Sequence, residues 1–338
     1  MLYAHAVRQI SQRMPESNTP DCSSGPAPAP SLDVSVVFAT RDRAEQLERT
    51  LDAYRALDTA GLTWELIVID NNSSDGTAAV IDRAAKYLPL IHLFVEAGGQ
   101  NRARNVAMDR LRGQFVVFTD DDVIPDPACL QAYVAAAARW PDDVIFGARI
   151  EPGFPDGTPE WMASRDFNFG TTAFARYAPR PDEGPVKTHP YGPSFAVRRE
   201  TLTGQRFPED LGPQTGNYAM GGEAAFLRGI AEQGYRYIHV PSAQVVHMVR
   251  PEQINDAWLL QRAQNKGRGQ VYLPTRRKPA RFHIQGMPAK LLLSVARAWA
   301  RYQLARLVSL RQRRVERAII YQLRLGRLME LRRQKRGE

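Results

Sequence analysis

The sequence predicts an α/β fold in which a mostly parallel central sheet is flanked by helices and followed by a basic helical extension. Apolar, β-branched runs alternate three times with segments of helical periodicity within about 90 residues, which is typical of a doubly wound sheet. Two of these runs end in acidic residues, where ligands of such sheets bind. We expect a disordered leader at 1–30, one large domain at 31–272 and a basic amphipathic helical tail at 273–338.

The first half of the chain has the more regular pattern. Residues 34–40 have the β-branched content of a buried strand, and the spacing of Leu47 and Leu51 predicts a helix over 41–56. Thr77 stands where a second helix begins, after a turn-forming Asn-Asn-Ser-Ser-Asp-Gly segment. The other predicted elements of this half are strands at 66–70, 92–95 and 115–118 and a helix from 98 to 111.

The second half is less regular. Between 151 and 193 lies a long segment rich in proline, glycine and aromatic residues, and a loop region of this length in a compact domain is usually functional. Residues 258–269, which include Arg262, Lys266 and Arg268, are expected to lead out of the domain toward a hinge at 274–279. The other predicted elements are helices at 130–140 and 220–230 and strands at 144–148, 194–197, 235–240 and 245–247.

Composition limits the class of protein. A chain of 338 residues with 43% hydrophobic residues buries a sizeable core, so disorder of the whole is excluded. Cys22 and Cys129 form neither a disulfide framework nor a metal-ligand pattern, which favours a reducing, cytoplasmic setting. No stretch reaches the ~18 consecutive apolar residues of a membrane-spanning helix, and the first residues lack the apolar core of a signal peptide.

Three adjacent carboxylates, Asp120, Asp121 and Asp122, follow the apolar run at 115–118. Such neighbours repel one another and raise one another's pKa unless a cation or hydrogen-bond donor compensates. Carboxylate oxygens without nearby cysteine suit Mg²⁺ or Mn²⁺, which leave coordination positions for substrate phosphates. The alternative is a solvated strand exit with no ligand.

An ordered set of short motifs strengthens the first interpretation. In chain order they are Thr40-Arg41, Asp70 with Asn72 and Asp75-Gly76-Thr77, Ala103-Arg104-Asn105, Thr119-Asp120-Asp121-Asp122, Phe207 to Pro213, Gly221-Gly222-Glu223, and Pro241 with His247. Over roughly residues 33 to 250 the sequence resembles glycosyltransferase family 2, whose members have the Rossmann-like GT-A fold. The resemblance implies metal-dependent, inverting transfer of a sugar from a nucleotide-diphosphate sugar, with a UDP-sugar favoured, to a glycan or lipid-linked acceptor.

The resemblance also implies roles for individual residues. Asp70 would accept from the N3–H of a uracil, as an acceptor-only carboxylate can, unless it is a turn aspartate. Arg104 would stack on the base or neutralise phosphate, and its alternative is an ordinary surface arginine. The implied donor-binding residues are Thr40, Arg41, Asp70, Asn72, Arg104, Asp120 and Asp121, and the implied metal ligands are Asp120, Asp122 and His247, the last of which is otherwise a core histidine.

The main departure from the family pattern concerns the catalytic base. The family carries Glu-Asp where this chain has Glu223-Ala224, and the missing aspartate is commonly the base. Glu223 is the favoured replacement because the other acids are intact, and Asp210 is a second candidate. The contrasting hypothesis is a non-catalytic partner that binds nucleotide sugars in a glycan-assembly complex.

Two other enzyme classes with similar folds do not fit. A nucleotidyltransferase needs a glycine-rich loop after the first strand to hold a triphosphate, and residues 40–45 contain no glycine. A dinucleotide-dependent dehydrogenase fails in the same way, because no Gly-x-Gly-x-x-Gly follows that strand.

The C-terminal tail is strongly basic. Residues 275–338 contain 18 Lys or Arg and 3 Asp or Glu, whereas the whole chain has a net charge of only +9. Apolar positions such as Leu292, Val295 and Trp299 share a helical face, which favours contact with an anionic membrane and a peripheral location at its inner face. Packing on the domain and formation of a homodimer are the alternatives, while nucleic acid is disfavoured because no base-stacking platform is evident.

Overall fold

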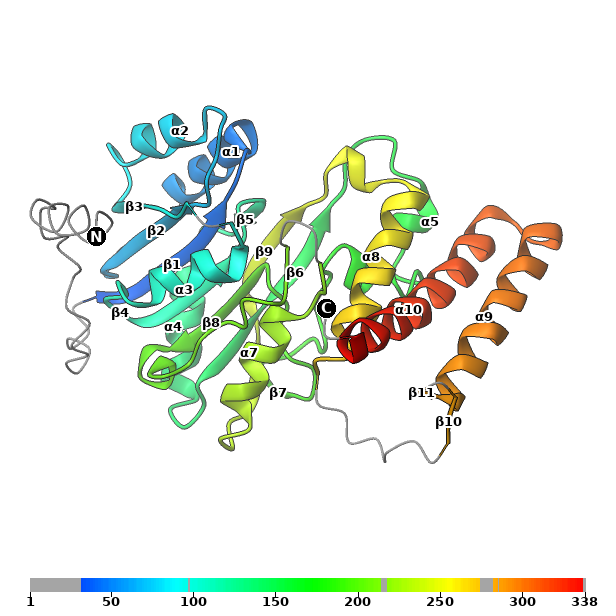
Figure 1. The fold of residues 1–338 in the computed structure, drawn as a ribbon. Helices are drawn as coiled ribbons and strands as arrows, with labels where there is room; N and C mark the ends of the chain where they lie inside the picture. Colours follow the sequence, from blue (N-terminus) through cyan, green and yellow to red (C-terminus); the bar gives the residue numbers. More distant parts are fainter. Residues whose placement is uncertain (1–31, 97, 214–217, 274–281, 285, 337–338) are drawn as a thin grey trace, which may run out of the picture.

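The computed structural model describes residues 32–96, 98–213, 218–273, 282–284 and 286–336. The predicted leader at 1–30 and hinge at 274–279 therefore lie outside the described residues. Figure 1 shows a sheet-containing body on one side and a pair of long helices on the other, with α8 (Asp256–Gly269) between them.

Nine strands of the described chain form one sheet in the order β3-β2-β1-β4-β8-β6-β9-β5, with β7 paired to β9. The strands β1, β2, β3 and β4 are parallel, as expected, whereas β8 runs antiparallel to both β4 and β6. The bounds are β1 Leu32–Thr40, β2 Trp64–Asp70, β3 Leu90–Phe94, β4 Gly113–Thr119, β5 Val123–Pro125, β6 Ile145–Gly153, β7 Gly184–Val186, β8 Ser194–Arg198 and β9 Tyr237–Met248.

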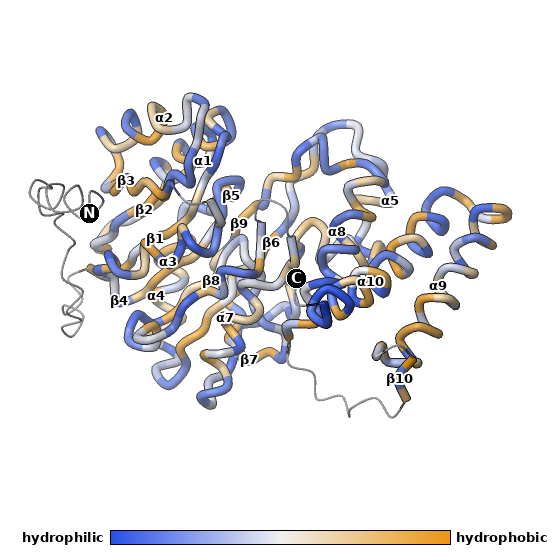
Figure 2. Tube along the Cα trace, in the orientation of Figure 1, coloured by the Kyte–Doolittle hydropathy of each residue, from blue (hydrophilic) through white to orange (hydrophobic). Residues whose placement is uncertain are grey.

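Helices cover both faces of this sheet because its central strands are apolar on both sides (Figure 2). One core contains Leu47 of α1, Ile81 of α2 and Tyr133 of α4, while α3 and α7 pack on the other face through residues such as Ala107 and Leu227. These helices are α1 Ala44–Arg55, α2 Thr77–Ala84, α3 Gln100–Met108, α4 Cys129–Arg139 and α7 Gly222–Ala231. The predicted α/β class is confirmed.

The structure differs from the sequence prediction in two places near the carboxylates. A short strand, β5, follows the three aspartates and pairs with β9, which is one continuous strand instead of two. The long segment at 151–193 contains β7 and two short helices, α5 (Glu160–Ala163) and α6 (Gly170–Ala173). Short 3-10 helices occur at Arg199–Leu202 and Pro251–Gln253.

Of the C-terminal helices, α10 packs against α8, and α9 packs against α10. In Figure 1, α10 (Arg311–Arg336) lies between α8 and α9 (Ala289–Val308), and a small hairpin of β10 (His283–Ile284) and β11 (Met287–Pro288) precedes α9. A Cβ on Gly267 of α8 would lie 2.0 Å from the carbonyl oxygen of Leu323 of α10, so the two backbones touch. Buried Glu330 of α10 accepts from Arg268 Nε at 2.8 Å. None of the described helices combines the length and apolar content that crossing a bilayer requires.

Candidate active site

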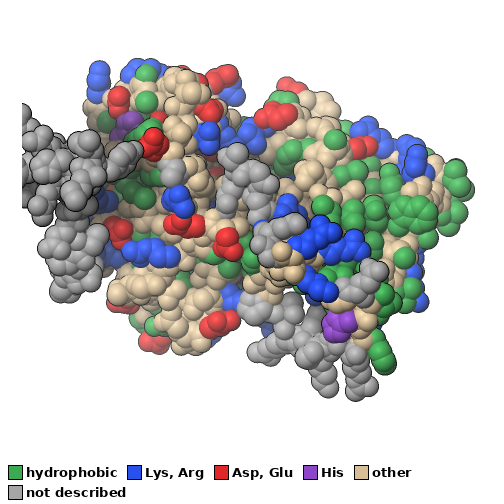
Figure 3. All heavy atoms as spheres, viewed as in Figure 1, with side chains coloured by type: hydrophobic (Ala, Val, Ile, Leu, Met, Phe, Trp, Pro, Cys, Tyr) green, Lys and Arg blue, Asp and Glu red, His purple; other side chains and the backbone are tan. Residues whose placement is uncertain are grey.

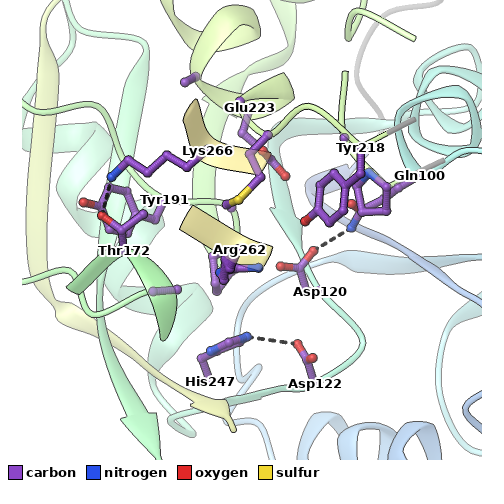
Figure 4. A pocket seen from close by; sticks show the side chains of 18 of the residues that line it. Gln100, Asp120, Asp122, Thr172, Tyr191, Tyr218, Glu223, His247, Arg262 and Lys266 are labelled. Atoms are coloured by element: carbon purple, nitrogen blue, oxygen red, sulfur yellow. Dashed lines mark hydrogen bonds and ion pairs between the residues drawn. The ribbon is translucent and has the colours of Figure 1, made fainter. Parts of the chain in front are cut away.

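A cavity of about 510 Å³ lies where the loops after β1 and β4 meet the N-terminal ends of α3 and α7, and α8 forms its opposite wall (Figure 4). Its lining includes all three residues of the acidic triplet, Asp120–Asp122, together with Glu223 and His247. Residues from distant parts of the sequence are therefore brought to one site, at the sheet edge where ligands of α/β proteins bind.

Arg43 compensates the charge of the acidic triplet. Its Nη1 contacts Asp121 Oδ1 and lies 3.4 Å from Asp122 Oδ2. Burial raises the pKa of Asp121 to about 6, although Arg43 acts in the opposite direction. The two carboxylates in turn raise the pKa of Arg43, even though burial alone would lower it. Arg43 was not recognised from the sequence, because its role depends on a contact with residues almost eighty positions away.

The backbone of the triplet is fixed by its neighbours. The Thr50 hydroxyl on α1 donates to the Asp121 carbonyl oxygen at 2.7 Å, and the Met248 amide on β9 donates to the Asp122 carbonyl oxygen at 2.8 Å. Val123, the first residue of β5, pairs with His247. The short strand missed from the sequence is therefore what brings His247 to Asp122.

His247 is buried and faces Asp122, with 3.5 Å between its Nε2 and Asp122 Oδ1. Its Nδ1 lies 3.2 Å from the carbonyl oxygen of Phe174, which accepts a hydrogen bond only if Nδ1 carries the proton. In the neutral ring Nε2 is then an acceptor that faces a second acceptor, the Asp122 carboxylate. A cation or a proton between the two groups would satisfy both.

Arg104 connects the triplet to Glu223. Its guanidinium is fully buried and donates to Asp120 Oδ1 at 2.7 Å and to Glu223 Oε1 at 2.9 Å. Gln100, one helical turn earlier on α3, donates to the same Asp120 oxygen at 3.0 Å. Arg104 is therefore neither a surface arginine nor part of the cavity lining, and it holds two carboxylates in place instead of facing open space.

Glycines allow Glu223 to approach Arg104. Gly221 precedes α7 with a φ of 122°, a conformation that other residues rarely adopt, and a Cβ on Gly222 would lie 2.2 Å from Asn101 Nδ2 of α3. Glu223 lies in the first turn of α7, where the helix dipole favours a negative charge. Burial would raise the pKa of Glu223, but Arg104, together with a backbone hydrogen bond and the charge of Arg262, lowers it, so the carboxylate is ionised at neutral pH.

Neither the position of the missing aspartate nor the second candidate, Asp210, supplies a proton acceptor in the cavity. Ala224 lines it but has no titratable group, and Asp210 is exposed and outside the lining. Glu223 is therefore the acid that lies in the cavity apart from the triplet.

The remaining predicted donor-binding residues lie at the ends of β1 and β2, next to the cavity instead of in its lining. Thr40 and Asp70 are aligned neighbours on these two strands and both are buried. Asp70 Oδ1 accepts from the Ser73 amide at 2.8 Å, while Asn72 is exposed with a φ of 62°. The exposed Arg41 contacts Asp42 at 3.5 Å.

The wall formed by α8 was not anticipated, because residues 258–269 were expected to lead away from the domain. Three of its residues and the residue that follows it line the cavity at intervals of four, namely Trp258, Arg262, Lys266 and Gln270. That spacing is visible in the sequence and is the signal that could have identified this face. Within the described residues, no three His, Cys, Asp or Glu side chains converge as a complete metal-binding set.

The comparison with known proteins agrees with this geometry. Residues 35–205, slightly more than half of the chain, match the family model described as glycosyl transferase family 2. The succinoglycan biosynthesis protein ExoM of Rhizobium meliloti is 26% identical over 240 residues, which cover 70% of this chain and 72% of ExoM.

Two solved structures have a similar fold. The mannosyltransferase PcManGT of Pyrobaculum calidifontis, in complex with GDP-Man and Mn²⁺, aligns with a TM-score of 0.58 at 22% identity, covering 90% of this chain and 89% of that one. Residues 1–349 of TarS of S. aureus, in complex with UDP, align with a TM-score of 0.51 at 16% identity, covering 91% of this chain and 92% of that one. The family match, the relative and the shared fold lead to one conclusion: this chain belongs to glycosyltransferase family 2 and is an enzyme of that type.

Proposed function

We propose that this enzyme transfers a sugar from a nucleotide-diphosphate sugar to a glycan or lipid-linked acceptor, with inversion at the anomeric carbon and with a divalent cation. The observation that carries the proposal is the bridge from Asp120 through Arg104 to Glu223. It joins the acidic triplet, suited to the donor diphosphate and its cation, to a second carboxylate suited to the acceptor. The donor and the acceptor would therefore both bind in one cavity.

The donor nucleoside is assigned to the ends of β1 and β2. Asp70 and Thr40 are adjacent there, and Asp70 retains an oxygen that can accept from the N3–H of a uracil. Arg41 and Asn72 flank this position on the two loops. PcManGT has GDP-Man and TarS has UDP in the related structures, so each base is a candidate, and UDP is favoured here because of Asp70.

The residues of the site fit a divalent cation. Asp122 and His247 offer an oxygen and a nitrogen 3.5 Å apart, and Asp120 is the other carboxylate on this side of the cavity. Two protein ligands are the usual number for Mg²⁺ or Mn²⁺ sites that are completed by substrate phosphates. When bound, the cation would offset the negative charge that develops on the departing diphosphate. PcManGT is described with Mn²⁺, which supports the same assignment.

Glu223 is assigned as the general base. It accepts the proton of the acceptor hydroxyl while the oxygen forms a bond to the anomeric carbon, and the bond from that carbon to the diphosphate oxygen breaks with its electron pair on the nucleoside diphosphate. Arg104 keeps Glu223 ionised and fixes its orientation. Glu223 thereby takes the role of the aspartate that the family carries at the position of Ala224.

The surface of α9 is assigned to an anionic membrane at the cytoplasmic face. Figure 3 shows apolar side chains gathered over the end of the molecule that α9 and α10 form. Arg297, Arg301 and Arg306 are exposed on the same helix, so both requirements of an interfacial helix are present. The exposed apolar residues of α9 and its C-terminal end are Leu293, Trp299, Leu304, Leu307, Val308 and Leu310.

The test is release of nucleoside diphosphate from a panel of UDP-, GDP- and dTDP-sugars, with Mn²⁺, with Mg²⁺ and with EDTA, in the presence of membrane lipid extract as a source of acceptor. We expect metal-dependent turnover on one donor, loss of turnover in Asp122→Ala and unchanged turnover in Asp52→Ala, since Asp52 is an exposed residue of α1. Donor binding without turnover on any donor would instead support the non-catalytic partner.

A further inference from the structure

One face of α8 is directed at the cavity and the other packs against α10. Leu259 and Ala263 belong to a core that also contains Val315 and Ile319 of α10. The backbones of the two helices are also in contact at Gly267. The packing on α10 therefore fixes which side chains of α8 are directed at the cavity.

Two of these side chains are cations without a carboxylate partner. In the described part of the chain, no Asp or Glu oxygen lies within ion-pair distance of Lys266 or Arg262, although the opposite wall is strongly acidic. Lys266 Nζ donates to the Thr172 hydroxyl at 2.6 Å and lies 5.9 Å from the Phe169 ring centre, and the Arg262 guanidinium lies over the Trp258 ring. Thr172 orients Lys266 without neutralising it, whereas Arg262 also hydrogen-bonds Tyr218 and interacts electrostatically with Glu223.

An unpaired, partly buried cation is costly unless a ligand supplies the counter-charge. Burial, with a smaller effect of Arg262, lowers the pKa of Lys266 to about 8. A bound anion would reverse this shift. The ammonium has three donors and Thr172 takes one of them, which leaves two for a ligand.

The position of Lys266 indicates which substrate carries the anion. In Figure 4, Lys266 and Thr172 lie on the side of the cavity away from Asp120 and Asp122. His189, another residue of the lining, is influenced electrostatically by both Glu223 and Lys266, so the base and the cation act on the same part of the cavity. The donor diphosphate is assigned to the triplet, which leaves the Lys266 end for the acceptor.

We propose that Lys266, with Thr172 and Arg262, forms a subsite for a carboxylate or phosphate group of the acceptor. The acceptor of this enzyme is then an acidic glycan or a phosphate-bearing glycan, and its anionic group sets the distance from which the attacking hydroxyl reaches Glu223. This inference rests on the proposed function, because the proposed function assigns the opposite end of the same cavity to the donor.

The test uses small soluble probes, which avoid binding to the apolar surface of α9. The protein is saturated with UDP or GDP and Mg²⁺, whichever nucleotide binds, and titrated by NMR with methyl β-D-glucuronide, methyl phosphate and methyl β-D-glucoside. The first and third differ only at C6, which is a carboxylate in the glucuronide and a hydroxymethyl group in the glucoside. Lys266→Met is compared with wild type and with Lys86→Met, which removes an exposed lysine from another part of the fold.

We expect wild type to bind the glucuronide or methyl phosphate at least about tenfold more tightly than the glucoside, and Lys266→Met to lose this preference. Lys86→Met should keep it. Thr172→Val, which removes only the hydroxyl that orients the ammonium, should weaken anion binding by a few-fold. Binding of the carboxylate probe but not the phosphate probe by wild type, or the reverse, identifies the class of acceptor.

Two results would overturn the subsite. One is equal binding of charged and neutral probes by wild type, or an unchanged preference in Lys266→Met. The other is binding of the anionic probe to the nucleotide-free protein that is lost once the nucleotide is bound, which would assign the cation to the donor. Failure of both nucleotides to bind with Mg²⁺ is a separate outcome, because it refutes the proposed donor site itself.

Discussion

Replacement of Arg104 by methionine tests the bridge between the triplet and Glu223. The substitution keeps much of the volume of the buried side chain but leaves Asp120 and Glu223 as neighbouring carboxylates without their shared cation. Breaking a buried ion pair on one side usually costs about 3–5 kcal/mol. Because the two carboxylates remain 21% and 27% exposed, we expect a loss of unfolding free energy near the lower limit, about 3 kcal/mol.

The pH dependence separates this electrostatic effect from a packing defect. Without Arg104, the pKa of Glu223 in the folded protein rises above that in the unfolded chain, and the pKa of Asp120, which burial already raises, rises further. Groups shifted in this direction destabilise the fold above their unfolded pKa, and protonation relieves the effect as the pH falls. The destabilisation should therefore be larger at pH 8 than at pH 5.

The assay is urea unfolding of wild type, Arg104→Met and the triple variant Arg104→Met/Asp120→Asn/Glu223→Gln at both pH values. The triple variant should recover much of the loss at pH 8, since it removes the uncompensated charges. Arg83→Met is the matched control, because Arg83 makes an exposed ion pair of 3.0 Å with Glu48 and should cost under about 1 kcal/mol. A loss that is independent of pH, and that the triple variant does not relieve, would refute the argument.

The remaining predictions concern the approach of α7, the anion subsite and the tail. Gly222→Ala should lower kcat/KM and thermal stability, because the new Cβ would lie 2.2 Å from Asn101 Nδ2. Gly229→Ala in the same helix, where the nearest neighbour lies at 3.6 Å, should be neutral or stabilising, and equal effects of the two substitutions would contradict the close approach of α7 to α3. The affinity for methyl β-D-glucuronide should be full below pH 7 and fall as the pH passes about 8, because Lys266 then loses its charge. The groups around Lys266 are Arg262 on α8, Thr172 on α6, Phe169 and His189. A flat affinity profile from pH 6.5 to 9.5 would exclude Lys266 as the anion ligand. The double variant Leu307→Glu/Val308→Glu should weaken binding to vesicles with anionic lipid at least about tenfold and leave stability unchanged, since these side chains are 82% and 75% exposed. Unaltered vesicle binding in a sedimentation assay would exclude α9 as the membrane contact.

The parallel strands and the acidic triplet could be predicted because their signals are local. The runs ending at Thr40, Asp70 and Thr119 are continuous and β-branched, so they are buried strands in almost any context. The strand β5 was missed because it has three residues, one of them a proline, and exists only through its pairing with β9.

The compensating charges could not be predicted in the same way. Arg43 and Gln100 become site residues through contacts with the triplet, and nothing in their immediate sequence indicates those partners. Arg104 was identified, but its burial between two carboxylates depends on the approach of α7 to α3. The basic face of α8 had a readable period of four residues, but the direction of that face is set by its packing on α10.

The central claim is that Glu223 is the base of a sugar-transfer site, and the most direct measurement is the effect of Glu223→Gln on kcat and on the dissociation constant of the donor. We predict a fall in kcat of about 10²–10⁴-fold, the usual contribution of a general base, with a donor dissociation constant within about twofold of wild type. The amide can still accept from Arg104 through its oxygen, so the bridge should persist. Full turnover in this variant would contradict the account.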